Sequence, residues 1–227
     1  MRGVHPQQYG APSLEALSNR LASLLARDDA TPLAAMRVEL VAILDAARDL
    51  EDRAERDPLT GAYNRHGLTR IAASVASRRR YTDEPLSALF IDIDRLKDLN
   101  RRHGHVATDG LLHAVTQRLR VLSQPYDTLV RWGGDEFVLL LPAVPLEEAA
   151  ALAERIRASI VAEPFSCEGT EVDLSVSIGV ADMRTDEHLV DLIRRISAKM
   201  YDAKGRGRNR IAVFDPHGVA QPVGRTG

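Results

Sequence analysis

The chain has 227 residues, of which 44% are hydrophobic, so it is long enough to bury one substantial core and to carry a modest extension. Its net charge of −2 gives no electrostatic basis for binding nucleic acid or an anionic membrane. The single cysteine, Cys167, excludes an intramolecular disulfide and fits a reducing compartment. No apolar run approaches the roughly 18 residues of a membrane span, and residues 1–6 lack a signal-peptide core, so we expect a cytoplasmic protein without membrane insertion.

The first quarter of the chain has a helical pattern. We expect residues 1–12 to be a flexible N-terminus and residues 13–56 to form a helical hairpin or coiled-coil stalk. Thr31 is expected to cap the second helix and Pro32 to occupy its first position. This helix carries a heptad seam, with apolar residues at alternating intervals of three and four, formed by Leu33, Met36, Leu40, Ile43, Ala47, Leu50 and Ala54. A shorter seam precedes it at Leu14, Leu17, Leu21 and Leu24.

Two such helices per chain predict a hairpin, and two chains would then form a four-helix bundle. The alternative is a helix that packs on its own following domain. Because the seam is continuous up to that domain, the pattern favours a homodimer through the N-terminal helices. A dimeric stalk would raise the effective concentration of the two domains that follow it.

The rest of the chain alternates helical and strand patterns. Helices are predicted near residues 65–79, 107–122, 146–162 and 187–203, and strands near 86–93, 172–180 and 210–214, with a hairpin around 131–140. This order predicts an α/β fold in which helices flank a central, mainly antiparallel sheet. Residues 216–227 are expected to be a flexible tail.

The predicted hairpin has two carboxylates at its tip. Gly133 and Gly134 stand between apolar segments, and we expect them to adopt the positive φ of a tight two-residue turn. Asp135 and Glu136 would then lie at the mouth of the sheet, where they are suited to hold a metal. Taken alone, such a turn is equally consistent with a solvated loop.

A second pair of carboxylates interrupts a buried strand. Asp92 and Asp94 occupy alternate positions, which the period of a strand places on one face. Buried unpaired carboxylates are costly, so they favour a cation. Mg²⁺ suits this arrangement because it typically takes one or two protein carboxylates together with substrate phosphates. The simplest pair is Asp92 with Asp135.

Two polar residues follow this strand on either side of a glycine-containing turn. Asn100 and Asp109 are nine positions apart, so they are able to converge on one small ligand. An amide that donates and accepts, beside a carboxylate that only accepts, matches the hydrogen-bonding edge of guanine. Asp109 is also suited to interact with the dipole at a helix N-terminus, and both roles are compatible.

Four motifs in order resemble the GGDEF domain of diguanylate cyclases. They are residues 57–65 (DPLTGAYNR), 92–97 (DIDRLK) with Asn100, Gly104, His105 and Asp109, 133–137 (GGDEF), and 201–210 (YDAKGRGRNR). The resemblance runs from about Asp57 to Phe214 and implies a catalytic domain over residues 57–215. Its implied fold is the palm-like fold of nucleotidyl cyclases. Four ordered motifs are a far stronger signal than one.

Members of this family join two GTP molecules into cyclic di-GMP and release two pyrophosphates, with each domain of a dimer presenting one GTP. The resemblance implies that Mg²⁺ or Mn²⁺ is held by Asp92, the Ile93 carbonyl, Asp135 and Glu136. The metal would neutralise phosphate charge and help the 3′-hydroxyl act as nucleophile. Asp135 and Glu136 are the two candidates to accept the proton, and the sequence does not choose between them.

The resemblance also assigns the substrate contacts. Asn100 and Asp109 would read guanine, and Lys204 and Arg208 would grip the terminal phosphates, for which an ammonium and a guanidinium are both suited. The same substrate-binding motifs include Leu96 and Lys97. Outside this family, Lys204 and Arg208 would be interpreted as ordinary basic residues near the end of a helix.

The chain departs from the family where many members bind their product. The usual inhibitory Arg, three residues before an Asp, is here Gln124, followed by Asp127. A neutral amide does not make the charged bidentate contact of an arginine, so we expect weak or absent product inhibition. Arg155 matches a secondary inhibitory Arg, and residual binding through Asp127 and Arg155 stays open.

Milder departures surround the site. Arg101 and Thr108 flank the predicted guanine pocket, Trp132 is an aromatic exchange that we interpret as packing, and His105 is implied to form structural hydrogen bonds. No ligand-sensing domain is recognisable, so the input signal or signalling partner is not identified. The alternative function is a non-catalytic GGDEF module that binds GTP or a protein partner.

Overall fold

The structure, a computed structural model, describes residues 33–79, 84–167, 169–185 and 187–214. The chain divides into two units, residues 1–54 and 55–227. The described part of the first unit belongs to α2 (Leu33–Glu55), whose last residue, Glu55, is the first residue of the second unit. Of the helices in these ranges, none combines the length and the apolar character needed to cross a bilayer.

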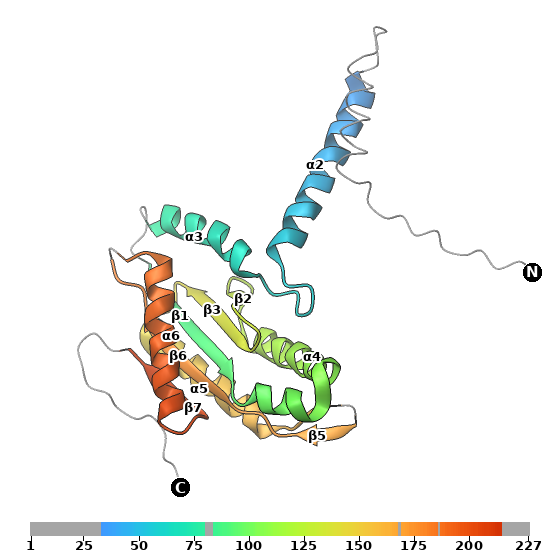
Figure 1. Cartoon of the computed structure of the whole chain (residues 1–227). Coiled ribbons are helices and arrows are strands. Elements are labelled where there is room, and N and C mark those ends of the chain that lie inside the picture. The colour runs from blue at the N-terminus through green and yellow to red at the C-terminus, as the bar shows by residue number, and fades with distance from the viewer. Residues whose placement is uncertain (1–32, 80–83, 168, 186, 215–227) are drawn as a thin grey trace, which may run out of the picture. The chain divides into compact units, whose positions relative to one another are not determined.

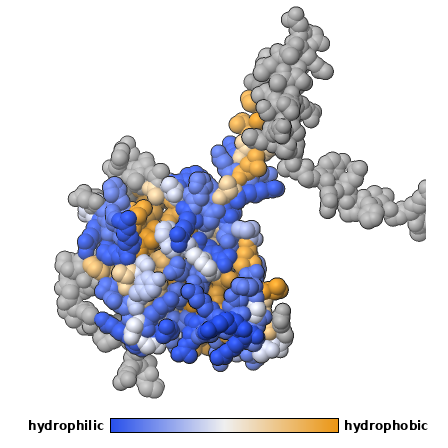
Figure 2. Space-filling view, in the orientation of Figure 1, coloured by the Kyte–Doolittle hydropathy of each residue, from blue (hydrophilic) through white to orange (hydrophobic). Residues whose placement is uncertain are grey.

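Helix α2 confirms that the seam is helical. Leu40 and Leu50 of the seam are 52% and 44% exposed in the single chain, and Val41 and Leu44 are exposed beside them. Figure 2 shows apolar residues at the surface of this helix. The shorter seam, the predicted cap at Thr31 and Pro32, and the segments 1–12 and 216–227 lie outside the described residues.

The second unit is built on a five-stranded sheet in the order β2-β3-β1-β6-β7. Only the pair β6 and β7 is parallel, so the prediction of a mainly antiparallel α/β sheet is confirmed. A separate two-stranded hairpin is formed by β4 and β5. The elements are α3 (Arg65–Arg79), β1 (Leu86–Ile93), α4 (Leu96–Leu122), β2 (Thr128–Arg131), β3 (Glu136–Pro142), α5 (Leu146–Ala162), β4 (Phe165–Cys167), β5 (Thr170–Val172), β6 (Val176–Asp182), α6 (Leu189–Gly205) and β7 (Arg210–Val213).

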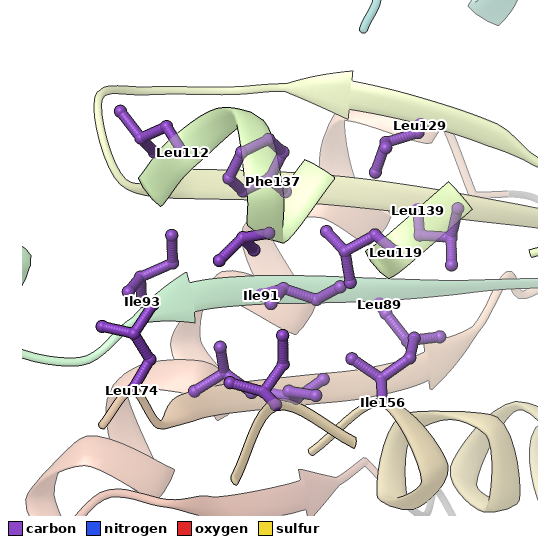
Figure 3. Close-up of a cluster of buried hydrophobic side chains, with 14 of the residues drawn as sticks. Leu89, Ile91, Ile93, Leu112, Leu119, Leu129, Phe137, Leu139, Ile156 and Leu174 are labelled. Atoms are coloured by element: carbon purple, nitrogen blue, oxygen red, sulfur yellow. The ribbon is translucent and has the colours of Figure 1, made fainter. Parts of the chain in front are cut away.

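The central strand β1 is buried along its whole length, and its alternation divides the core into two layers. Leu89, Ile91 and Ile93 pack with residues of α4 and α5, and Figure 3 shows them among Leu112, Leu119 and Ile156. Ala88 and Phe90 pack on the opposite face with residues of α3 and α6. Helix α6 therefore covers one face of the sheet while α4 and α5 cover the other (Figure 1). Asp92, at the next even position, belongs to the α6 face.

One predicted helix was incomplete, and one predicted strand was wrong. Helix α4 is interrupted at Gly104 (φ 81°, ψ 173°), and the part after this glycine contains the predicted helix of residues 107–122, whereas the helical segment that begins at Leu96 was not predicted. The strand expected over residues 172–180 is two strands, because Val172 pairs with Phe165 in the small hairpin whereas Val176 pairs with Ile93 in the main sheet. Hydrophobic alternation does not reveal such a change of partner.

Helix α6 approaches β6 closely because of one glycine. A Cβ atom at Gly179 would lie 2.0 Å from the carbonyl oxygen of Ile196 and 2.6 Å from the amide nitrogen of Met200. Such distances exclude any side chain, so the helix backbone rests directly on the strand. This contact fixes the height of α6 above the sheet and brings its last turn, with Lys204, to the end of β1.

Candidate active site

Three acidic residues from two distant segments meet where β1 ends and β3 begins. Asp92 is directly opposite Glu136 in the antiparallel register, which places both side chains on the α6 face. The Ile93 N–H donates to the Asp135 carbonyl at 3.1 Å. The structure thus brings together Asp92, Ile93, Asp135 and Glu136, the residues predicted to hold a metal.

Asp92 is held in an environment that disfavours its charge. Only 2% of the residue is exposed, and burial raises its pKa to about 6. A hydrogen bond from Lys204 opposes this rise, while the nearby charges of Asp135 and Glu136 add to it. The Lys204 Nζ lies 2.6 Å from Asp92 Oδ2. The lysine predicted as a phosphate anchor therefore also contacts the predicted metal ligand.

These carboxylates fit a divalent cation that also binds a phosphate of the substrate. A desolvated carboxylate with two like charges beside it gains most from a nearby positive charge. Across the described residues, no group of three or more His, Cys, Asp or Glu side chains is arranged to hold a metal by itself. Mg²⁺ needs no such cage, because one or two carboxylates and substrate phosphates satisfy it.

The hairpin loop differs from the predicted two-residue turn. Four residues, 132–135, separate β2 from β3, and neither Gly133 nor Gly134 has a positive φ. The N–H groups of Trp132 and Gly133 instead donate to the Glu136 carbonyl at 2.8 and 3.2 Å. A Cβ atom at Gly133 would lie 2.6 Å from Glu136 Oε2, so this glycine makes room for a carboxylate.

A partly buried arginine, which the sequence did not single out, holds this loop. Arg131 donates through Nη2 to the Gly134 carbonyl at 2.9 Å and through Nη1 to both carboxylate oxygens of Asp57 at 3.0 and 3.1 Å. Asp57 also accepts hydrogen bonds from the N–H and hydroxyl of Thr60. Burial raises the pKa of Asp57, but the bonds from Thr60 and Arg131 outweigh it and leave the pKa lowered. The 57–65 motif therefore fixes the loop that carries Asp135.

Trp132 packs as expected. Its ring meets Phe90 edge to face, with centroids 6.4 Å apart, and the Arg65 guanidinium lies 4.5 Å from the Trp132 centroid. Arg65 also donates to the Trp132 carbonyl. These contacts secure the hairpin loop from its other side.

The predicted guanine-reading residues lie on α4, on either side of its kink. Asn100 Nδ2 is 3.0 Å from His105 Nδ1, and the Thr108 hydroxyl donates to Asn100 Oδ1 at 3.1 Å. Asp109 follows Thr108 directly and is exposed. The kink at Gly104 thus places Thr108, the residue next to Asp109, against Asn100. The convergence of Asn100 and Asp109 on one ligand stays a prediction. Nearby, Leu96 is buried and Lys97 is exposed.

Lys204 and Arg208 lie near the end of α6, where the sequence placed them. Helix α6 ends at Gly205, and Arg208 lies in the following loop with φ 63°. The N–H groups of Arg206, Gly207 and Arg208 turn back to the last carbonyls of the helix, on Asp202, Lys204 and Ala203 respectively. This ending satisfies groups that would otherwise lack partners. Lys204 is half-buried, whereas Arg208 is exposed.

The residues of the expected inhibitory site lie apart from the carboxylates. Gln124 is exposed in the turn after α4, and its backbone N–H donates to Asp127 Oδ2 at 2.7 Å. Burial raises the pKa of Asp127, although this hydrogen bond opposes the rise. Arg155 is exposed on α5.

Comparison with known proteins identifies the family. The family model described as "Diguanylate cyclase, GGDEF domain" matches residues 54–210. Diguanylate cyclase DgcP of Pseudomonas aeruginosa is 35% identical over 208 residues, covering 91% of this chain and 30% of DgcP. Diguanylate cyclase DgcM of Escherichia coli is 38% identical over 162 residues, covering 71% of this chain and 39% of DgcM. The chain thus spans between a quarter and two fifths of the length of these curated relatives.

A solved structure supports the fold over a larger part of the chain than the family model does. Diguanylate cyclase SiaD from Pseudomonas aeruginosa, in complex with its activator SiaC, matches with a TM-score of 0.71 and 28% identity. The match covers 88% of this chain and 76% of SiaD. Because the family model covers well over half of the chain, the chain belongs to the family of GGDEF-domain diguanylate cyclases.

Proposed function

We propose that this protein is a diguanylate cyclase that condenses two GTP molecules into cyclic di-GMP and two pyrophosphates. The observation that carries this proposal is the meeting of Asp92, Asp135 and Glu136 at the end of β1, with the Lys204 ammonium 2.6 Å from Asp92. Acidic and basic groups in one place suit a reaction between phosphates and hydroxyls. The curated relatives DgcP and DgcM, both named diguanylate cyclases, support it.

Substrate recognition is assigned to α4 and to the end of α6. The Asp109 carboxylate would accept hydrogen bonds from guanine N1 and N2, for which adenine offers no equivalent donors, and Asn100 would complete the recognition. Leu96 and Lys97 lie at the start of the same helix. Lys204 and Arg208 would bind the terminal phosphates, and they neutralise the charge that pyrophosphate carries as it leaves.

The carboxylates fit Mg²⁺ or Mn²⁺, which would be held by Asp92, the Ile93 carbonyl, Asp135 and Glu136. When bound, the ion polarises phosphate oxygens and lowers the pKa of a hydroxyl. The 3′-oxygen of one GTP forms a bond to the α-phosphorus of the other, and the bond from that phosphorus to the bridging oxygen of pyrophosphate breaks. Asp135 or Glu136 accepts the hydroxyl proton.

One GTP per domain requires two domains, so we propose a homodimer. The exposed seam residues Leu40 and Leu50 on α2 support an association of helices from two chains. Such an association would hold the two catalytic domains near one another, which raises the rate of a reaction that needs both. A nucleoside triphosphate substrate also fits a cytoplasmic protein. SiaD is described with an activator, and we propose that an unidentified signalling partner regulates this protein too.

Product inhibition is proposed to be weak. With Gln124 in place of an arginine, the corner around Asp127 lacks the charged fork that would bind a guanine edge or phosphate. Calorimetry with cyclic di-GMP tests this, with Gln124→Arg as the gain-of-function comparison. Tight, submicromolar binding by the wild type that depends on Asp127 would contradict the proposal.

The activity test uses the purified full chain, GTP and Mg²⁺, with products identified by chromatography. Asp135→Ala removes one proposed ligand, and Asp173→Ala, at an exposed carboxylate, is the matched control. We expect cyclic di-GMP from the wild type and the control variant, and none from Asp135→Ala. GTP that is bound but unreacted by a confirmed dimer would instead indicate the alternative, a non-catalytic binding module.

A further inference from the structure

Asp94 is a buried carboxylate that the proposed metal site does not use. Its Oδ1 accepts a hydrogen bond from the Ser177 hydroxyl at 2.7 Å. Its Oδ2 accepts one from the Ser175 hydroxyl at 2.7 Å and one from the Asn209 backbone N–H at 3.0 Å. Three donors occupy most of the acceptor capacity of a carboxylate. Asp94 is therefore satisfied by the protein itself.

The residue that Asp94 contacts is held from a second side. The Asn209 side-chain oxygen accepts a hydrogen bond from Arg157 Nη1 on α5 at 2.8 Å. Arg157 is in turn fixed by the Glu154 carboxylate, with Nε to Oε2 at 2.9 Å and Nη2 to Oε1 at 2.5 Å. We call Asp94, Arg157 and Asn209 the Asn209 clamp. It ties the loop after α6 both to the end of β1 and to α5.

The clamped loop has an unfavourable backbone conformation. Arg208 and Asn209 have φ angles of 63° and 47°, both in the left-handed region that non-glycine residues seldom adopt. Two consecutive residues of this kind persist only where the surroundings over-determine them. The Asn209 clamp supplies that constraint, and Arg210 Nε adds a hydrogen bond to the Arg208 carbonyl at 3.0 Å.

We propose that Asp94 and Arg157 are positioning residues that hold the loop of residues 206–209 so that Arg208 faces the terminal phosphates of the substrate. The assignment of Arg208 rests on the proposed function, whereas the clamp itself does not. Loss of the clamp should weaken contacts to the terminal phosphates and leave guanine recognition on α4 intact. Asp94 would then contribute to binding without contacting substrate or metal.

The first test needs no substrate. Hydrogen exchange is measured at the Asn209 amide in the full chain, for the wild type, Asp94→Asn, Arg157→Gln and the exposed control Asp173→Asn. We expect exchange to be at least about tenfold faster in the two clamp variants, because the amide loses its acceptor or its loop loosens. Unchanged exchange in both variants would overturn the clamp, and Arg157→Gln keeps the test decisive if Asp94→Asn fails to fold.

The second test distinguishes binding of the terminal phosphates from binding of the guanine base. Affinities for a non-hydrolysable GTP analogue and for GMP are measured by calorimetry in Mg²⁺. We expect each clamp variant to bind the analogue about tenfold more weakly and GMP as the wild type does. In an Arg208→Ala background, the clamp substitutions should cause no further loss. A loss that persists in full in that background, or that is equal for GMP, would overturn the positioning role. A wild type that binds neither nucleotide would refute the proposed function, while hydrogen exchange still decides the clamp.

Discussion

Asp92 and Asp94 stand two residues apart at the end of β1 and both are buried, yet their surroundings differ. Asp94 accepts three hydrogen bonds, from Ser175, Ser177 and the Asn209 N–H. Asp92 contacts an ammonium group and has two further carboxylates beside it, and burial raises its pKa to about 6. The burial of a carboxylate therefore does not by itself indicate a metal site. What decides is whether the neighbours supply donors or further negative charge.

The largest effect on activity should come from neutralising Asp92, which accepts fewer hydrogen bonds than Asp94. Asp92→Asn keeps the shape of the side chain and removes its charge. We expect cyclic di-GMP synthesis to fall by roughly a thousandfold, which corresponds to the several kcal/mol that metal coordination supplies to a transition state. Initial rates at saturating GTP and Mg²⁺ measure it. An Asp92→Asn variant with near wild-type activity would show that Asp92 does not serve as the metal ligand.

Removing the cation beside Asp92 sharpens the comparison. Lys204→Met keeps much of the side-chain length but deletes the ammonium that lies 2.6 Å from Asp92 Oδ2. Because the Lys204 hydrogen bond lowers the pKa of Asp92, its loss should raise that pKa further. If Lys204 also binds phosphate, the KM for GTP should rise by at least about tenfold. Carboxyl NMR titration and steady-state kinetics test the two effects separately, and an unchanged KM would remove Lys204 from the substrate site.

Asp94→Asn should lower the stability of the protein more than Asp92→Asn does, whereas Asp92→Asn should lower the activity more. Asp94→Asn leaves at least one of three donors without its acceptor, so we expect the free energy of unfolding to fall by about 2 kcal/mol. The equivalent change at Asp92 removes a charge that burial disfavours, so it should cost less or even stabilise. Urea denaturation at pH 7.5 in a chelating buffer compares the two variants. Equal losses from both would contradict the contrast.

A further effect is the pH dependence of that stability. The pKa of Asp92 is raised from 3.8 to about 6 on folding, so the folded state binds the proton more tightly. The associated stability is fully present below pH 3.8 and is lost as the pH rises through about 6. The wild type should therefore lose stability relative to Asp92→Asn between about pH 4 and pH 6, with no further change above. A difference that grows only above pH 7 would assign the titration to another group.

Long elements of this fold were predictable from the sequence, whereas the shortest ones were not. Strand β1 and helices α3 and α5 have the predicted bounds, because long apolar periodicities set them. The three-residue strands of the β4-β5 hairpin were missed, because each is too short to show a period. The order of the family motifs was enough to identify the carboxylates of Asp92, Asp135 and Glu136 from the sequence alone.

The contacts that position those carboxylates could not be predicted from the sequence. Arg131 and Asp57 are 74 residues apart, and nothing local to either indicates that they form an ion pair. The partners of Asp94 lie 81, 83 and 115 residues further along the chain. The left-handed residues Arg208 and Asn209 depend on the same long-range contacts, so the sequence did not predict their backbone conformation.

The most direct test places both carboxylates in one experiment. The wild type, Asp92→Asn and Asp94→Asn are incubated with GTP over a series of Mg²⁺ concentrations, and the products are resolved by chromatography. We expect cyclic di-GMP from the wild type, essentially none from Asp92→Asn, and a reduced yield from Asp94→Asn with an unchanged Mg²⁺ requirement. Substantial product from Asp92→Asn, or a shifted Mg²⁺ requirement in Asp94→Asn, would contradict this expectation.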